Sequence, residues 1–142
     1  MNAVAVQRCV PAAGIPAAAS LRLWAKSAIR KKGDLTIRIV DETESEALNG
    51  RYRKKHKPTN VLSFGYGETG VLGDLVICAP VVAREASEQH KKLRVHWAHM
   101  VVHGCLHLQG HDHENQKAAE AMEALEVRIM EQLGFNNPYL ET

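Results

Sequence analysis

The sequence predicts an α+β protein with one domain, residues 1–142, in which a mixed sheet of about four strands packs with about five helices. Its length of 142 residues suits a single domain whose core needs no disulfide or other staple. Segments with strand and helix patterns follow one another without internal repeats or a linker. Two of the strands are separated only by a short glycine-rich loop, which is typical of a hairpin-like unit. We therefore expect helices to cover at least one face of the sheet.

The first half of the chain is predicted to form two strands and two helices. Pro16 fits the first turn of a helix, and Gly33 is suited to its end. The second strand alternates in polarity and is rich in β-branched side chains. Asp41 and Thr43 are both able to cap the helix that follows it. The four elements are a strand over residues 3–10, a helix from 16 to about 32, a strand over 35–40 and a helix from 41 to about 53.

The second half is predicted to contain the hairpin-like pair of strands and three helices. The loop between the two strands has three glycines in six residues. The second of the three helices is apolar on most sides, which indicates a buried helix at the centre of the fold. Asp112 is a candidate cap of the last helix, and Gly134 is suited to its end. The five elements are strands over residues 61–64 and 71–78 and helices over 80–92, 95–108 and 114–133.

Four histidines lie within eleven residues of the buried helix and the loop after it. His103 and His107 are four residues apart, so a helix places both imidazoles on one face. Gly110 can adopt the left-handed conformation that ends a helix and turns the chain back. His113 then lies three residues past that turn and can reach the same ion. Three neutral imidazoles with one open position describe a catalytic zinc site, with one Zn²⁺ held by these three residues.

Three further residues near this site have more than one interpretation. His99 precedes His103 by one helical turn and is either another ligand or a packed or capping histidine. His111 competes with His113 for the third ligand position, and the spacing favours His113. Asp74 lies inside an apolar strand and is expected to form a hydrogen bond either with a ligand histidine or with a backbone amide near Gly73.

The ligand spacing H-x-x-x-H-x-x-G-x-x-H is that of the metzincin peptidases. In those enzymes the residue after the first histidine is the glutamate that serves as general base, whereas this chain has Gly104. The metal ligands of a peptidase are therefore present without its base. A different reaction is expected at this site.

The composition excludes several classes of protein. The net charge of +2 is only mildly basic, so any surface that binds nucleic acid would have to be local. Aromatic residues make up 5% of the chain, which argues against a broad base-stacking platform. No apolar run approaches the roughly 18 residues of a membrane span. We expect no signal peptide, because Pro11 and Pro16 interrupt the apolar stretch near the start.

The three cysteines are odd in number and far apart in the sequence, and no two of them form a C-x-x-C pair. This pattern favours a reduced, cytoplasmic protein with small buried thiols over a disulfide framework. The cysteines are Cys9, Cys78 and Cys105.

A basic segment, residues 51–57, contains five lysines and arginines in seven positions and ends at Pro58. Such runs are usually solvated surface. The alternative is an edge that binds phosphate, where arginine offers a two-pronged donor and lysine a point charge. Composition alone leaves both interpretations open.

Three stretches of the chain resemble the YbeY family of metal-dependent bacterial endoribonucleases, and the resemblance covers nearly the whole chain. The resemblance implies zinc ligands at His103, His107 and His113 and a functionally important arginine at Arg53. The activity that it implies is cleavage of single-stranded RNA. The implied role is maturation of the 3′ end of the small-subunit ribosomal RNA, together with ribosome quality control in the cytoplasm. The implied partners are the ribosome and its associated factors, and no membrane is involved. The stretches are Tyr52-Arg53 with residues 57–64, residues 72–78, and residues 96–104 continuing to Asp112-His113.

A mechanism follows for such an enzyme. The metal would polarise a phosphoryl oxygen or activate a water, which makes a protein glutamate dispensable. Arg53 would stabilise the charge that builds on the phosphate oxygens. Two other functions remain as alternatives: a metallopeptidase-like hydrolase, suggested by the ligand spacing, and a non-catalytic ribosome-binding module that zinc only stabilises.

Overall fold

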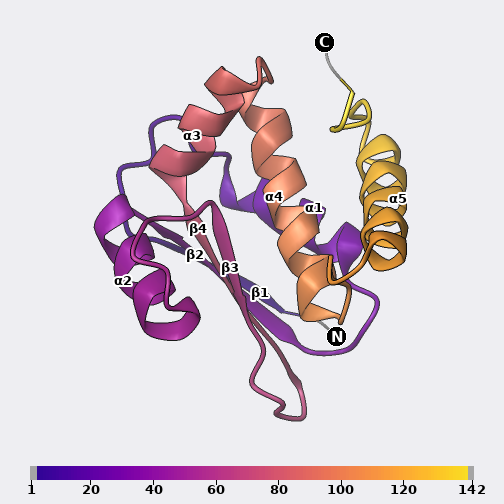
Figure 1. The fold of residues 1–142 in the computed structure, drawn as a ribbon, viewed down its shortest axis with the longest axis horizontal. Coiled ribbons are helices and arrows are strands. Elements are labelled where there is room, and N and C mark those ends of the chain that lie inside the picture. Colours follow the sequence, from indigo (N-terminus) through magenta and orange to yellow (C-terminus); the bar gives the residue numbers. More distant parts are fainter. Residues whose placement is uncertain (1–2, 141–142) are drawn as a thin grey trace.

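A four-stranded mixed sheet forms the frame of the protein in the computed structural model, which describes residues 3–140. The strand order is β1-β2-β4-β3. The first three strands in this order are parallel, and β3 is antiparallel to β4. The hairpin-like unit predicted from the sequence is thus confirmed as the β3–β4 pair (Figure 1). The strands are β1 (Val4–Arg8), β2 (Asp34–Val40), β3 (Val61–Phe64) and β4 (Val71–Cys78).

Five helices pack with this sheet within the described part of the chain, as the α+β prediction requires. Helix α4 runs through the middle of the molecule, and Figure 1 shows α5 beside it and α2 on the opposite side of the molecule. None of the helices in residues 3–140 combines the length and apolar character that crossing a bilayer requires. The helices are α1 (Ala18–Ala28), α2 (Glu42–Arg53), α3 (Ala79–Glu88), α4 (Leu93–Leu108) and α5 (Gln116–Gln132).

The sheet has a hydrophobic core on each face. Leu35, Ile37 and Ile39 of β2 are buried in the larger core, which α1, α4 and α5 complete. The intervening Arg38 points to the other face, where its guanidinium pairs with Glu44 of α2. A smaller core lies on that second face. Helix α4 is buried along most of its length, as its apolar sequence predicts. The smaller core consists of Val40, Leu62, Val76, Cys78 and Val81.

Helix α1 ends at Ala28, four residues before the predicted end near Lys32. The cause is a tertiary contact with Gln109, whose side chain is almost fully buried. Its amide oxygen accepts hydrogen bonds from the backbone N–H groups of Arg30 (2.6 Å) and Lys31 (3.1 Å). Its amide nitrogen donates to the carbonyls of Ala28 and Cys105. Gln109 is 79 positions from Arg30 in the chain. Its side chain thus replaces the hydrogen bonds that a further helical turn would make.

The capping predictions were right for one helix and wrong for another. Asp41 caps α2, because its carboxylate accepts a hydrogen bond from the Glu44 N–H at 2.9 Å. Asp112 does not cap α5. Asn115 takes that position and accepts from the Ala118 N–H at 2.8 Å, while Asp112 bonds the Glu114 N–H in the preceding turn. The polar loop before α5 contains several residues able to cap, and the sequence does not distinguish them.

Asp74 makes neither of the two contacts predicted for it. Its carboxylate accepts a hydrogen bond from the Tyr66 hydroxyl. Asp74 and Val76 line a small cavity together with Leu48 of α2, so the Asp74 side chain lies on the face of the sheet away from α4. The histidines of α4 are therefore out of its reach.

Two glycines permit close contacts around β4. Gly73 has φ of +147°, and a Cβ built on it would lie 2.3 Å from the carbonyl oxygen of Phe64. Gly104 of α4 packs against β4, and a Cβ there would lie 2.7 Å from a methyl carbon of Leu75. Glycine thus lets β3 pair tightly with β4 and lets α4 lie directly on the hairpin.

Gly73→Ala is expected to lower the free energy of unfolding by about 3 kcal/mol, because alanine is strained at this φ and its Cβ meets backbone that cannot move aside. Urea denaturation measures the loss. Gly67→Ala is the matched control, since Gly67 also has a positive φ but has open space around it. The control is expected to lose about 1 kcal/mol. Equal losses for the two variants would contradict the close contact at Gly73.

Candidate metal centre

Helix α4 carries His103 and His107 one turn apart, near its carboxyl end. The helix stops in a Schellman motif: the Gly110 N–H donates to the His107 carbonyl, and the His111 N–H donates to the Leu106 carbonyl. Gly110 has φ of +99°, the left-handed conformation predicted for it. The chain therefore reverses after α4.

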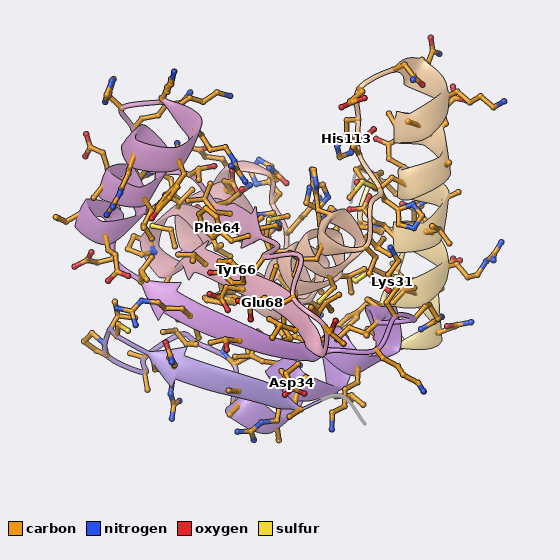
Figure 2. All side chains as sticks on the ribbon, turned by 90° about the horizontal axis from the view of Figure 1, so that it is seen from below. Lys31, Asp34, Phe64, Tyr66, Glu68 and His113 are labelled. Atoms are coloured by element: carbon orange, nitrogen blue, oxygen red, sulfur yellow. The ribbon has the colours of Figure 1, made fainter. Side chains whose placement is uncertain are left out.

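The reversal brings His113 back to the two histidines of α4. One ring nitrogen from each of His103, His107 and His113 lies within 4.8 Å of the others. The ring of His113 stacks on that of His103 with centroids 5.2 Å apart. His103 is half-buried, whereas His107 and His113 are exposed, so the cluster opens to solvent. Figure 2 shows His113 on the loop that leads into α5, and in that view Phe64 lies between this loop and α2.

The donor set of this three-histidine cluster fits a zinc ion. Three imidazole nitrogens with solvent on the fourth side match the composition of catalytic zinc sites. Burial lowers the pKa of His107, and the neighbouring His103 and His113 lower it further. The neutral imidazole is thereby favoured, and this is the form that binds a metal. His111 does not belong to the cluster.

A buried carboxylate, Glu126 of α5, lies behind the cluster. Its side chain is 0% exposed. One of its oxygens is 2.7 Å from Nδ1 of His103 and 3.1 Å from Nε2 of His99, and the other accepts a hydrogen bond from the Tyr139 hydroxyl. Burial alone would raise the pKa of Glu126, but the hydrogen bonds from His103, His99 and Tyr139 outweigh it and hold the pKa at about 2. Glu126 is therefore ionised.

The sequence interpretation missed Glu126, although a signal was present. Residue 126 falls on the apolar stripe of α5, between the buried Met122 and Met130. A carboxylate in a buried stripe requires a partner, which points to a polar cluster. His99 is part of that cluster: it is buried, bonds Glu126 and packs its ring edge-on against Tyr139 at 5.1 Å. The packed interpretation of His99 is the one that the structure favours.

Arg53, the last residue of α2, is connected to α4 through β3. Its guanidinium donates to the Ser63 carbonyl at 2.9 Å, and the Ser63 hydroxyl donates to the Gly104 carbonyl at 3.3 Å. The charge of Arg53 is one of the causes that lower the pKa of His107, after burial and the two other histidines. Arg53 thus lies on the side of the molecule where the three-histidine cluster opens.

The basic segment 51–57 is exposed at every position. The loop that follows α2 is nonetheless fixed, because the buried Asn49 donates to the Lys57 carbonyl at 2.8 Å and Ser45 bonds the backbone of Thr59. Tyr52 packs edge-on against Phe64, and Arg51 lies over the Tyr52 ring. Cationic and aromatic side chains therefore stand together beside Arg53.

Position 104 has no room for the glutamate base of a peptidase. A Cβ on Gly104 would point at Leu75 and Val61 of the hairpin, 2.7 Å and 3.3 Å away from their nearest carbons. A glutamate there would be directed into the hydrophobic core. The packing of α4 on the sheet thus accounts for the glycine that departs from the peptidase pattern.

The fold and the site define an α+β protein with a solvent-facing cluster of three histidines on its central helix. The sequence model of the family described as "Endoribonuclease YbeY" matches residues 17–134. A relative described as "Endoribonuclease YbeY" from Alteromonas mediterranea is 53% identical over 134 residues, which cover 88% of this chain and 85% of that protein. The chain belongs to the YbeY family of endoribonucleases.

A solved structure shares the fold. The solution structure of a protein from Thermotoga maritima superimposes with a TM-score of 0.58 at 22% identity, covering 99% of each chain. The likeness extends over the sheet and helices as a whole, so the architecture described above is that of a known fold.

His96 of α4 forms a separate polar contact. Its Nε2–H donates to a Glu85 oxygen at 2.9 Å, and Asn60 also donates to the Glu85 carboxylate. These bonds join α3, α4 and the start of β3. Burial lowers the pKa of His96, and the Glu85 carboxylate only partly opposes this effect.

The pKa of His96 predicts a pH dependence of stability. Because the folded pKa is below the ordinary value of 6.5, the unfolded chain binds the proton more readily. The contribution of His96 to the free energy of unfolding is fully present above about pH 6.5. It falls as the pH drops towards the folded pKa, by up to about 1.4 kcal/mol per pH unit. Urea denaturation between pH 7.5 and pH 5, with chelator present, is expected to show a shallower slope for His96→Gln than for the wild type. His56→Gln, at an exposed histidine, is the control; an unchanged slope in His96→Gln would refute the assignment.

Proposed function

We propose that this chain is a metal-dependent endoribonuclease that cuts single-stranded ribosomal RNA, with one zinc ion held by His103, His107 and His113. The observation that carries the proposal is the solvent-facing three-histidine cluster with Arg53 beside its opening, in a member of an endoribonuclease family. Residues 1–142 would form one catalytic domain.

The chemistry divides between the metal and the chain. When bound, zinc would supply Lewis-acid polarisation of a phosphoryl oxygen and activation of water near neutral pH. The chain supplies the neutral imidazoles that hold it and the guanidinium of Arg53, which is permanently charged. Arg53 is hydrogen-bonded to Ser63 and lies over Phe64, so its position is fixed before substrate arrives. A preorganised cation stabilises the charge that develops on the phosphate oxygens.

The surface around Arg53 suits a single strand. Tyr52 is 51% exposed and Tyr66 is 54% exposed, and unpaired bases stack on such rings. The basic segment 51–57 provides exposed cations for the phosphates of the same strand. The aromatic surface is small, in agreement with the low aromatic content.

The biological setting is proposed from the family. We place the action of the chain in maturation of the small-subunit RNA 3′ end and in ribosome quality control, with the ribosome and its associated factors as partners, in the cytoplasm. Cys9, Cys78 and Cys105 are all free thiols, which suits a reducing compartment; Cys78 and Cys105 are buried as predicted, whereas Cys9 is exposed.

His107→Ala is expected to abolish both zinc binding and cleavage of single-stranded ribosomal RNA, because two imidazoles hold the ion too weakly. A chelator should stop cleavage by the wild type in the same way. The measurements are the zinc content of purified protein and gel analysis of the RNA. His56→Gln, outside the cluster, is the control and should keep its zinc. RNA that is bound but uncut by every sample would instead support a ribosome-binding module stabilised by zinc.

Arg53→Glu is expected to leave zinc bound and to reduce the cleavage rate by about 100–1,000-fold, the usual effect of losing one donor to a developing oxyanion, about 3–4 kcal/mol. Arg51→Glu is the matched control, because it reverses a charge on the same helix. The Arg51 guanidinium lies over the ring of Tyr52. The Arg51→Glu variant should bind RNA more weakly, and its binding should depend less on salt, while the maximal cleavage rate changes less. Similar maximal rates for Arg53→Glu and the wild type would remove Arg53 from the reaction.

A further inference from the structure

We propose that Glu126 and Tyr139 are positioning residues that fix the tautomer and orientation of His103, so that the carboxy-terminal segment holds the metal centre in place. This inference rests on the proposed zinc site. It assigns a role to two residues that contact neither the ion nor the RNA. Their effect is expected on metal affinity, through one ligand histidine.

The geometry fixes which nitrogen of His103 is available to a metal. An oxygen of the buried Glu126 lies 2.7 Å from His103 Nδ1, a hydrogen-bond distance. A carboxylate only accepts, so Nδ1 must carry the proton. In the neutral imidazole, which is the form that binds a metal, Nε2 then carries no proton, and its lone pair is available to an ion shared with His107 and His113. Neutral imidazole has one donor and one acceptor nitrogen, and Glu126 selects between them.

A second cation between His99, His103 and Glu126 is the competing explanation, since their polar atoms also lie within 4.8 Å of one another. The distances argue against it. Ligand atoms about 2.0–2.1 Å from one tetrahedral ion are separated by roughly 3.3 Å or more. Here the Glu126 oxygen is only 2.7 Å from His103 and 3.1 Å from His99. Both histidines are hydrogen-bonded to the same Glu126 oxygen, and Glu126 has no exposed surface.

Tyr139 determines how the Glu126 carboxylate is oriented. Its hydroxyl donates to the oxygen that the histidines do not use. The Tyr139 ring packs edge-on against His99, and the preceding Pro138 is buried. With both oxygens engaged, the carboxylate cannot rotate away from His103 without breaking at least one hydrogen bond. Burial and the hydrogen bond to Glu126 raise the pKa of Tyr139, so the phenol remains a donor.

The charge of Glu126 makes the contact stronger than a neutral one. Hydrogen bonds to an ionised acceptor are about twice as strong as those between neutral groups. Partners of this kind, which bond a metal-binding histidine through its other nitrogen, typically change metal affinity by about 10–100-fold when they are removed. The two positions are thus expected to affect zinc affinity although neither contributes a ligand to the proposed zinc site.

The test is a zinc competition titration against a chromophoric chelator, with full-length wild type, Glu126→Gln, Tyr139→Phe and Glu120→Gln. We expect one zinc per wild-type chain, an affinity about 10–100-fold lower for Glu126→Gln and about 10-fold lower for Tyr139→Phe. Glu120→Gln is the matched control, because Glu120 lies exposed on the same helix and accepts a hydrogen bond from Gln116, away from the histidines. Wild-type affinity in both Glu126→Gln and Tyr139→Phe would overturn the proposal and leave the zinc site intact.

A second measurement decides the proposal even if the wild type binds no zinc. Long-range ¹H–¹⁵N NMR of the metal-free wild type reports the tautomer of each histidine, and His103→Ala identifies the signal of His103. We expect the proton on Nδ1. A proton on Nε2 would overturn the role of Glu126. A proton on Nδ1 in a protein that binds no zinc would support the role of Glu126 and refute the proposed metal function. Thermal unfolding of the metal-free variants shows whether Glu126→Gln folds; Tyr139→Phe provides the affinity result if it does not.

Discussion

The direct packing of α4 on the β3–β4 hairpin is the constraint on which the rest of the structure depends. Gly104 makes it possible, because any side chain there would collide with Leu75 and Val61. The close approach lets the Ser63 hydroxyl reach the Gly104 carbonyl, and Ser63 in turn anchors Arg53. The same glycine that removes the base of a peptidase therefore brings an arginine from α2 to the opening of the histidine cluster.

A buried charge at Glu126 is costly unless every lone pair is used. Here two imidazoles from α4 and a phenol from the segment that follows α5 satisfy the carboxylate. A polar cluster of this kind adds little net stability compared with well-packed apolar residues. Its benefit is geometric, because a carboxylate engaged on both oxygens orients its donors uniquely. The cluster is best understood as support for the proposed metal centre, and the neutral His96 contact with Glu85 joins other elements in a similar manner.

The sequence predicted what depends on local spacing. The helix that carries His103 and His107, the left-handed Gly110 and the return of His113 all follow from a few neighbouring residues, and the fold class follows from the order of the segments. What it did not predict depends on tertiary contacts or, as at the Asn115 cap of α5, on a choice between neighbouring polar residues. The end of α1 is set by Gln109, and the partner of Asp74 is Tyr66 across the hairpin. Glu126 escaped notice because its partners come from another helix and from the end of the chain. The ligand roles of the three histidines and the role of Arg53 remain predictions.

The placement of the groups also bears on how RNA would be selected. Helix α4 carries two of the proposed metal ligands and a hydrogen bond to β3 orients Arg53, whereas the lysines of the basic segment project into solvent. Cations that contact phosphate position a strand but do not read its bases. The exposed tyrosines stack on any base, so stacking does not distinguish one base from another either. The proposed endoribonuclease would then distinguish substrates by whether a strand is free to enter. For the proposed ribosomal RNA substrate, the choice of one site would therefore have to come from the folding of the RNA or from a partner that presents it.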